Sequence, residues 1–169
     1  IETMVSIIIT LYNKEKSIRR AILSAINQTY RDIEIIVIDD CSTDDSKKIC
    51  EEYNESIKLY STEKNSGLPH SRRLGIEMAK GEFITFVDAD DYIELDMVDE
   101  LIKPIQNEHT IVFCDNTEIW SKNIDERKLF CDISTKELTK EIVLEEIASG
   151  RAGLVCGKLF ERNIITENN

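Results

Sequence analysis

Two long apolar runs that end abruptly in aspartate constrain the fold of this chain more than any other feature. The runs lie at residues 33–38 and 83–87, and they are followed by Asp39-Asp40 and by Asp88-Ala89-Asp90-Asp91. A third run lies at residues 5–9. Segments with apolar side chains on both faces are typical of strands in a parallel sheet that is covered on both sides.

Helical periodicity separates these runs. Residues 18–26 place apolar side chains at intervals of three and four, which predicts an amphipathic helix. Residues 42–45 supply an N-cap signal for a second helix through Tyr53, and residues 57–60 fit another strand. Pro69 is expected to open a third helix that ends in a left-handed cap at Gly81. The alternation predicts an α/β fold, with a mostly parallel sheet flanked by helices.

The second half of the chain is less regular. The pattern predicts a helix over 97–105, a strand over 111–114, a helix over 138–147 and a last strand within 154–160. Residues 116–132 show no clear period, and no closing element is evident before Asn169.

Composition excludes several classes of protein. The 21 Lys and Arg residues against 33 Asp and Glu give a net charge of −12, so broad contact with nucleic acid or anionic lipid would be repulsive. The odd number of cysteines, 5, without a Cys-x-x-Cys pair indicates reduced thiols and a cytoplasmic location. No apolar run is long enough for a transmembrane segment.

The polar residues after the strands indicate where chemistry could occur. Ligands of an open parallel sheet bind beyond the carboxyl ends of its strands. Carboxylates collected there would repel one another unless a cation compensates, and oxygen ligands suit Mg²⁺ or Mn²⁺. The inferred ligand is a metal-bound phosphate ester, and Arg72, early in a helix behind Gly67, could meet a diphosphate. The alternative is that these aspartates only end strands and cap helices, which we prefer for Asp44 and Asp96.

Three segments carry a family resemblance. They are residues 6–14 (SIIITLYNK), 25–46 (AINQTYRDIEIIVIDDCSTDDS) and 65–91 (NSGLPHSRRLGIEMAKGEFITFVDADD). In order and spacing they resemble the family 2 glycosyltransferases, which have the Rossmann-like GT-A fold. The resemblance covers residues 5–101. It implies a donor-binding core over residues 4–115 and an incomplete acceptor-side region over 116–169, with the C-terminal part truncated.

The resemblance also implies roles for individual residues. Thr10, Tyr12 and Asp40 would hold the nucleobase of a nucleotide diphosphate sugar, with uracil preferred, and Arg72 would lie near the diphosphate. Asp88 would face the ribose or donor sugar, and Asp90 would bind Mn²⁺ or Mg²⁺.

The implied reaction is transfer of the sugar with inversion to a saccharide or lipid-linked saccharide in polysaccharide or glycoconjugate synthesis. Related enzymes suggest peripheral membrane association, with the protein at the inner face of the membrane.

Two departures qualify the resemblance. Cys41 stands where the family usually has glycine. The general base of similar enzymes follows a stretch like residues 156–160, so we expect it beyond Asn169 and expect nucleotide binding with poor sugar transfer. Two alternatives remain: a non-catalytic nucleotide-binding module, and a receiver-like phosphoacceptor domain that would use Asp39, Asp40 and Asp88.

Overall fold

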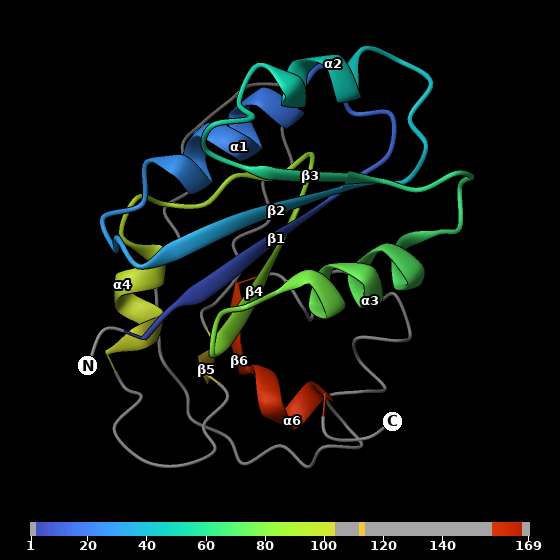
Figure 1. Ribbon diagram of the computed structural model, residues 1–169. Coiled ribbons are helices and arrows are strands. Elements are labelled where there is room, and N and C mark those ends of the chain that lie inside the picture. The colour runs from blue at the N-terminus through green and yellow to red at the C-terminus, as the bar shows by residue number, and fades with distance from the viewer. Residues whose placement is uncertain (1–2, 104–111, 114–156, 167–169) are drawn as a thin grey trace.

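A six-stranded sheet forms the centre of the computed structural model, which describes residues 3–103, 112–113 and 157–166 (Figure 1). The strands lie in the order β3-β2-β1-β4-β6-β5. Their bounds are β1 Val5–Leu11, β2 Ile33–Asp39, β3 Lys58–Ser61, β4 Phe83–Asp88, β5 Val112–Phe113 and β6 Lys158–Glu161. The first four strands are parallel and β6 is antiparallel to β4, which confirms the predicted mostly parallel sheet.

Helices cover both faces of the sheet (Figure 1). One face packs against α1 (Ile18–Ile26), α2 (Ser46–Glu51) and α4 (Met97–Ile102), and the other packs against α3 (Leu68–Met78). A short helix, α6 (Arg162–Thr166), follows β6. Alternate residues of β1 serve the two cores: Ile7 and Ile9 face the α1 side, whereas Ile8 faces α3. The fully apolar character of the strands follows from this double cover.

The chain reverses direction across the sheet at β1. It proceeds outward from β1 to β2 and β3, and α3 then brings β4 back to the other side of β1. The register places Thr10 beside Asp88 and Leu11 beside Asp39. In parallel sheets, such a switch point leaves a crevice beyond the strand ends.

Glu34, at the start of β2, connects the N-terminal ends of the neighbouring strands, opposite the carboxyl ends where the crevice lies. Its carboxylate accepts hydrogen bonds from Ser6 Oγ at 2.6 Å and from the Lys80 and Gly81 amides, and it pairs with Lys58 Nζ at 2.6 Å. These contacts join the beginnings of β1, β2 and β3 to the turn before β4. The buried carboxylate is therefore fully compensated.

Several element predictions need correction. Gly81 is not a left-handed cap, because α3 ends at Met78 with an extended residue, Ala79, after it, and Gly81 does not have a positive φ. Glycine is required there by close approach, since a Cβ atom would lie 2.6 Å from the Ser6 amide nitrogen. The second helix begins where the N-cap signal predicts, with Asp45 as its N-cap residue and the Asp44 side chain accepting from the Ser46 amide, but it ends at Glu51, before Tyr53.

Other predictions fall partly or wholly outside the described residues. The predicted helix over 138–147 and the first part of the predicted strand over 154–160 lie outside the described residues, whereas Lys158–Glu161 is a strand. Within the described ranges, no helix has both the length and the apolar character needed to span a membrane.

Candidate functional site

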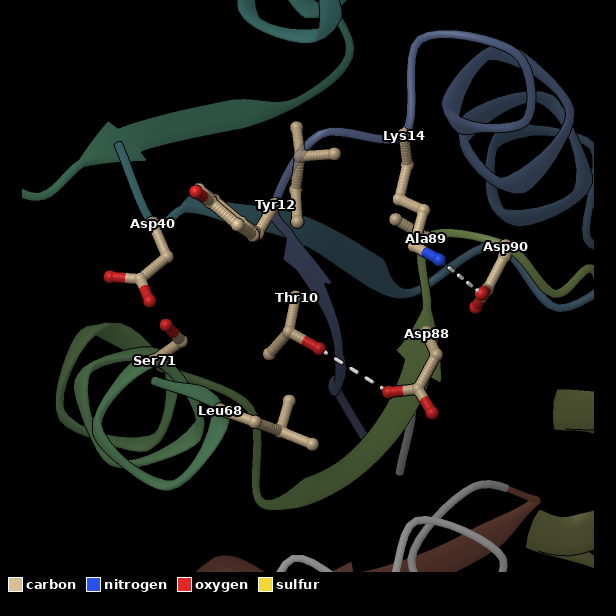
Figure 2. Close-up of a pocket in the computed structure, with 10 residues that line it drawn as sticks. Thr10, Tyr12, Lys14, Asp40, Leu68, Ser71, Asp88, Ala89 and Asp90 are labelled. Carbon is tan, nitrogen blue, oxygen red and sulfur yellow. Dashed lines mark hydrogen bonds and ion pairs between the residues drawn. The ribbon is translucent and has the colours of Figure 1, made fainter. Parts of the chain in front are cut away.

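A cleft of about 220 Å³ opens at the carboxyl ends of β1 and β4, at the switch point of the sheet (Figure 2). Its walls come from the end of β1, the segment after β2, the start of α3 and the loop after β4. The lining residues are Thr10, Leu11, Tyr12, Lys14, Asp40, Leu68, Ser71, Asp88, Ala89 and Asp90. Five of the six residues singled out from the sequence therefore meet in one cleft.

The floor of the cleft is formed by Thr10 and Asp88, which are register partners on adjacent strands. Thr10 Oγ1 donates a hydrogen bond to Asp88 Oδ1 at 3.3 Å (Figure 2). Thr10 is buried, whereas the Asp88 side chain retains 20% exposure toward the cleft. The strand pairing thus fixes the position of this carboxylate without removing it from solvent.

Arg72 is the sixth predicted residue, and it does not line the cleft. Its side chain is fully buried, it lies over the Phe86 ring at 5.9 Å, and its Nη2 donates to Asp88 Oδ1 at 3.2 Å. Within the part of the chain that the structure describes, its Nε and Nη1 atoms have no hydrogen-bond partner. Arg72 therefore supports Asp88 from inside the protein rather than from the cleft.

Asp40 holds the segment that enters α3. Its carboxylate accepts from Thr62 Oγ1 at 2.9 Å, from the Ser66 amide at 2.9 Å and from the Gly67 amide at 2.7 Å. A carboxylate offers about four acceptor positions. Three donors leave room for roughly one more on the side of Asp40 that faces the cleft.

Gly67 and Tyr12 shape the entrance on either side of Asp40. Gly67 has a φ of 86°, in the region that glycine tolerates best, and it lets the chain turn into α3 beside the Asp40 carboxylate. Tyr12 is 44% exposed on the rim of the cleft. An exposed aromatic ring in this position offers a stacking surface to a planar ligand.

Asp39 does not belong to the cleft, although the sequence places it beside Asp40. It is buried, and its carboxylate accepts from the Ser42 amide at 3.1 Å and from Ser61 Oγ at 3.3 Å. Strand alternation separates the two neighbours, since successive side chains point to opposite faces. Asp39 stabilises the loop, and Asp40 faces the cleft.

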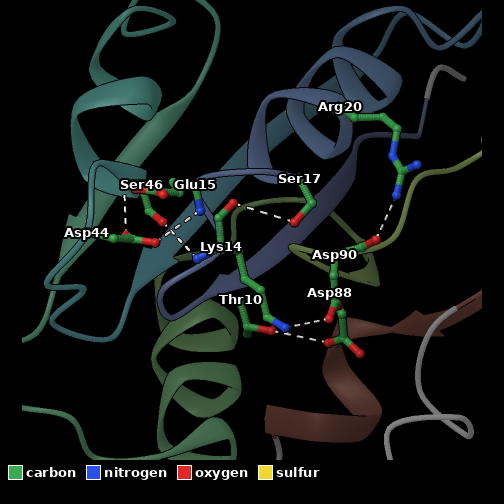
Figure 3. A network of polar contacts seen from close by, with 9 residues as sticks. All are labelled: Thr10, Lys14, Glu15, Ser17, Arg20, Asp44, Ser46, Asp88 and Asp90. Atoms are coloured by element: carbon green, nitrogen blue, oxygen red, sulfur yellow. Dashed lines mark hydrogen bonds and ion pairs between the residues drawn. The ribbon is translucent and has the colours of Figure 1, made fainter.

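The loop after β4 concentrates negative charge. Partial desolvation, followed by the charges of Asp88 and Asp90, raises the pKa of Asp91. Asp90 pairs with Lys14 Nζ at 2.6 Å, and its carbonyl oxygen accepts from Arg20 Nη2 at 2.9 Å (Figure 3). Lys14 and Arg20 thus offset the negative charge of this loop, and a bound metal cation would do the same.

The oxygen atoms of the cleft fit a divalent cation that is coordinated partly by the protein and partly by the phosphate groups of a bound molecule. Mg²⁺ and Mn²⁺ favour oxygen ligands, and Mg²⁺ commonly takes one or two carboxylates together with substrate phosphates. Among the described residues, no group of three Asp, Glu, His or Cys side chains could hold a metal ion. Asp90, exposed at the cleft, could supply one ligand, and the others would come from a bound phosphate and water.

Five lining residues were not singled out from the sequence: Leu11, Lys14, Leu68, Ser71 and Ala89. Leu11 and Ala89 each lie between two residues that were. Lys14 follows two residues after Tyr12, so its place in the loop after the first strand was an available signal. Leu68 and Ser71 lie on the first turn of α3, next to Gly67 and Arg72. Their place in the cleft wall depends on how α3 docks on the sheet, which no local sequence pattern shows.

Comparison with known proteins agrees with this geometry. The sequence model of Glycosyl transferase family 2 matches residues 6–146. Glycosyltransferase GlyA of Streptococcus pneumoniae is 41% identical over 107 residues, which cover 62% of this chain and 15% of GlyA. The chain spans about half or less of the length of the curated relatives it matches.

Two solved structures share the fold. Staphylococcus aureus TarS 1-349 in complex with UDP-GlcNAc superposes with a TM-score of 0.72 at 28% identity, over 97% of this chain and 47% of that one. GalNAc-T7 with UDP, GalNAc and Mn²⁺ superposes with a TM-score of 0.57 at 28% identity, over 63% and 22%. The fold, the cleft at its switch point and the matched family agree: the chain belongs to glycosyltransferase family 2.

Proposed function

We propose that this chain forms the donor-binding half of an enzyme that transfers a sugar from a UDP-sugar to an acceptor hydroxyl, with inversion and with a divalent cation. The observation that carries the proposal is the meeting of Asp40, Asp88 and Asp90, from separate segments, in one cleft with Thr10 and Tyr12. The complexes of TarS with UDP-GlcNAc and of GalNAc-T7 with UDP and Mn²⁺ support it. In this proposal, residues 4–115 form the donor core and 116–169 part of the acceptor side.

The nucleobase would lie between Tyr12 and Asp40. The Tyr12 ring offers a stacking face, and the remaining acceptor position of Asp40 suits the N3–H of uracil. Thr10 would border the base at the end of β1. A cytosine ring lacks a hydrogen on N3, so the same position would discriminate against it.

The ribose and diphosphate would extend from there toward β4. Asp88, which is held by Thr10 and Arg72, presents a carboxylate to the ribose or donor sugar. Arg72 would act near the nucleotide through Asp88, because it is buried beneath that residue. Asp90 would hold the cation, which when bound stabilises negative charge on the diphosphate.

The chain's own contribution to transfer is then positional and electrostatic. The cleft fixes the donor so that its leaving group lies at the acidic loop after β4, and the acceptor must approach from the opposite face of the sugar. Inversion requires a base on that face to take the acceptor proton. A saccharide or lipid-linked saccharide acceptor at the inner face of the membrane belongs to the same proposal.

A receiver-like domain does not fit the structure. Receiver domains place β1 between β2 and β3, whereas here β1 lies between β2 and β4. Asp39, which such a site would use, is buried and bonded to Ser42 and Ser61. The remaining alternative is a non-catalytic nucleotide-binding module.

Thermal unfolding with a panel of nucleotides tests the proposed ligand. At a concentration of about 100 times Kd, a ligand stabilises the folded state by about 2.7 kcal/mol, which corresponds to a rise in Tm of several degrees. We expect UDP and UDP-sugars with Mn²⁺ to give this rise, and CDP, ADP and GDP to give much less. Equal shifts for all nucleotides, or none, would contradict the proposal.

Activity of the full-length protein separates an enzyme from a binding module. With the donor that stabilises best and a panel of saccharide acceptors, an enzyme releases UDP in step with a glycosylated product. If the full-length protein binds the UDP-sugar but releases no UDP and forms no glycosylated product, the result would support the non-catalytic alternative.

A further inference from the structure

Lys14 has a main chain held by hydrogen bonds and an exposed side chain whose ammonium group pairs with Asp90. Its amide donates to Ser46 Oγ at 2.8 Å (Figure 3). Its carbonyl accepts from the Ser17 and Ile18 amides at 3.1 and 2.9 Å. Ser46 is fully buried, so this anchor is well defined. Lys14 can therefore move chiefly by rotation about the bonds of its four-carbon side chain above the cleft.

The ion pair that this side chain makes is easy to exchange. Lys14 Nζ lies 2.6 Å from Asp90 Oδ2, but the two side chains are 43% and 53% exposed. Ion pairs between exposed groups contribute on average little to stability, because solvent screens them and ordering both side chains has an entropic cost. A divalent cation that binds Asp90 can therefore displace the ammonium group at small cost.

The other positively charged side chains near the site already have partners within the protein. Arg72 is buried against Asp88. Arg20 donates to the Asp90 carbonyl oxygen and stacks on the Tyr92 ring at 4.6 Å. Among the described residues that line the cleft, Lys14 is the only one with a positive charge.

We infer that Lys14 is an exchangeable counter-ion of the donor site: it neutralises Asp90 in the free protein and transfers to the diphosphate oxygens when a cation occupies Asp90. The inference rests on the proposed function, because it requires a diphosphate in the cleft. It assigns Lys14 as a donor-binding residue and makes the metal and the nucleotide bind cooperatively. The diphosphate draws the Lys14 ammonium group away from Asp90, which frees Asp90 for the cation. The cation in turn neutralises Asp90, which would otherwise repel the diphosphate.

Opposite effects of one substitution test this inference. In Lys14→Met, loss of the competing ammonium group should tighten binding of Mn²⁺ alone by about threefold to fivefold, as expected for removal of an exposed ion pair. The same variant should bind UDP about tenfold more weakly at saturating Mn²⁺, because a charge-assisted contact to the diphosphate is lost. Uridine, which has no phosphate, should bind equally well to both proteins.

The measurements are electron paramagnetic resonance of free Mn²⁺ for the metal and calorimetry for UDP and uridine. Lys16→Met is the matched control, since Lys16 is exposed on the same loop and does not line the cleft. It makes the same change in net charge and should alter each affinity by less than twofold. Far-ultraviolet circular dichroism and the Tm confirm that both variants are folded.

The outcomes distinguish the inference from the proposed function. If the unsubstituted protein binds neither UDP nor Mn²⁺, the proposed function is wrong and the inference falls with it. If it binds both, but Lys14→Met changes neither affinity, or changes both in the same direction, or behaves like Lys16→Met, then the inference alone is overturned. Tighter metal binding together with weaker UDP binding and unchanged uridine binding supports it.

Discussion

Cys41 adopts a backbone conformation that disfavours side chains with a Cβ atom. Its φ is 63°, in the left-handed region, directly after Asp40. A non-glycine residue there costs about 1–2 kcal/mol from the contact between Cβ and the carbonyl oxygen. The family resemblance leads us to expect glycine at this position, and a left-handed φ is a physical reason for that expectation.

Replacing Cys41 by glycine should therefore stabilise the protein. Relief of strain exceeds the greater entropy of glycine in the unfolded chain, so we expect a gain of about 0.5–1 kcal/mol in the free energy of unfolding. Urea denaturation measures it. Cys41→Ala is the control, because it removes the thiol but keeps the strain and should give no such gain. A less stable glycine variant would show that the Cys41 side chain stabilises the loop.

Glu34 is a buried carboxylate whose polar contacts lie outside the cleft. Burial opposes its ionisation, but the hydrogen bonds from Lys58, Ser6 and the Lys80 amide outweigh this effect, so the pKa of Glu34 is lowered. A lowered pKa in the folded state means that the ionised form stabilises the fold at neutral pH. That stabilisation is lost as the pH falls below the ordinary value of 4.5 and through the folded-state pKa.

Glu34→Gln should thus destabilise the protein in a pH-dependent way. At pH 7 we expect a loss of about 2–3 kcal/mol, because charged hydrogen bonds are replaced by weaker ones. The difference from the unsubstituted protein should shrink as the pH falls toward about 3. Glu55→Gln, at an exposed position, should show neither effect. A deficit that is constant with pH would contradict the role of the Glu34 charge.

At the scale of elements, α3 links the packing of the sheet to the cleft. Gly75 lies so close to β1 that a Cβ atom would be 2.5 Å from Ile8 Cγ2. The same helix begins with Leu68 and Ser71 in the cleft wall and carries Arg72 to Asp88. The distance of α3 from the sheet therefore sets the shape of the cleft.

Gly75→Ala should affect both stability and binding. Forcing an extra methyl group into this contact is expected to cost about 1–3 kcal/mol. Because α3 must shift outward, UDP binding should also weaken, by severalfold in calorimetry. Combining Gly75→Ala with Ile8→Ala, which removes the clashing atom, should cost less than the sum of the single changes. Strict additivity would show that the helix does not contact β1 in this way.

At the scale of the whole molecule, the sequence predicted much of the fold and part of the site. The apolar strands and the residues at their ends are local features, and the meeting of strand ends follows from any parallel sheet. Thr10, Tyr12, Asp40, Asp88 and Asp90 could therefore be placed together in advance. Their roles toward a ligand remain predictions.

Other features depend on tertiary contacts that no local pattern encodes. The burial of Arg72 under Asp88 and the reach of Lys14 to Asp90 follow from how α3 and the loop after β1 dock on the sheet. Gly81 has the sequence signature of a helix cap, but its requirement comes from the backbone of β1, which is far away in sequence. Such contacts require the assembled structure.

The central claim is that Asp90 helps to hold a cation that assists UDP binding in this cleft. Titration of UDP by calorimetry, with and without Mn²⁺, tests it most directly in the unsubstituted protein, in Asp90→Asn and in Asp45→Asn, an exposed aspartate outside the cleft. We predict that Mn²⁺ tightens UDP binding about tenfold or more in the unsubstituted protein and in Asp45→Asn, and has little effect in Asp90→Asn. An undiminished effect of Mn²⁺ in Asp90→Asn, or no UDP binding by the folded protein, would contradict the account.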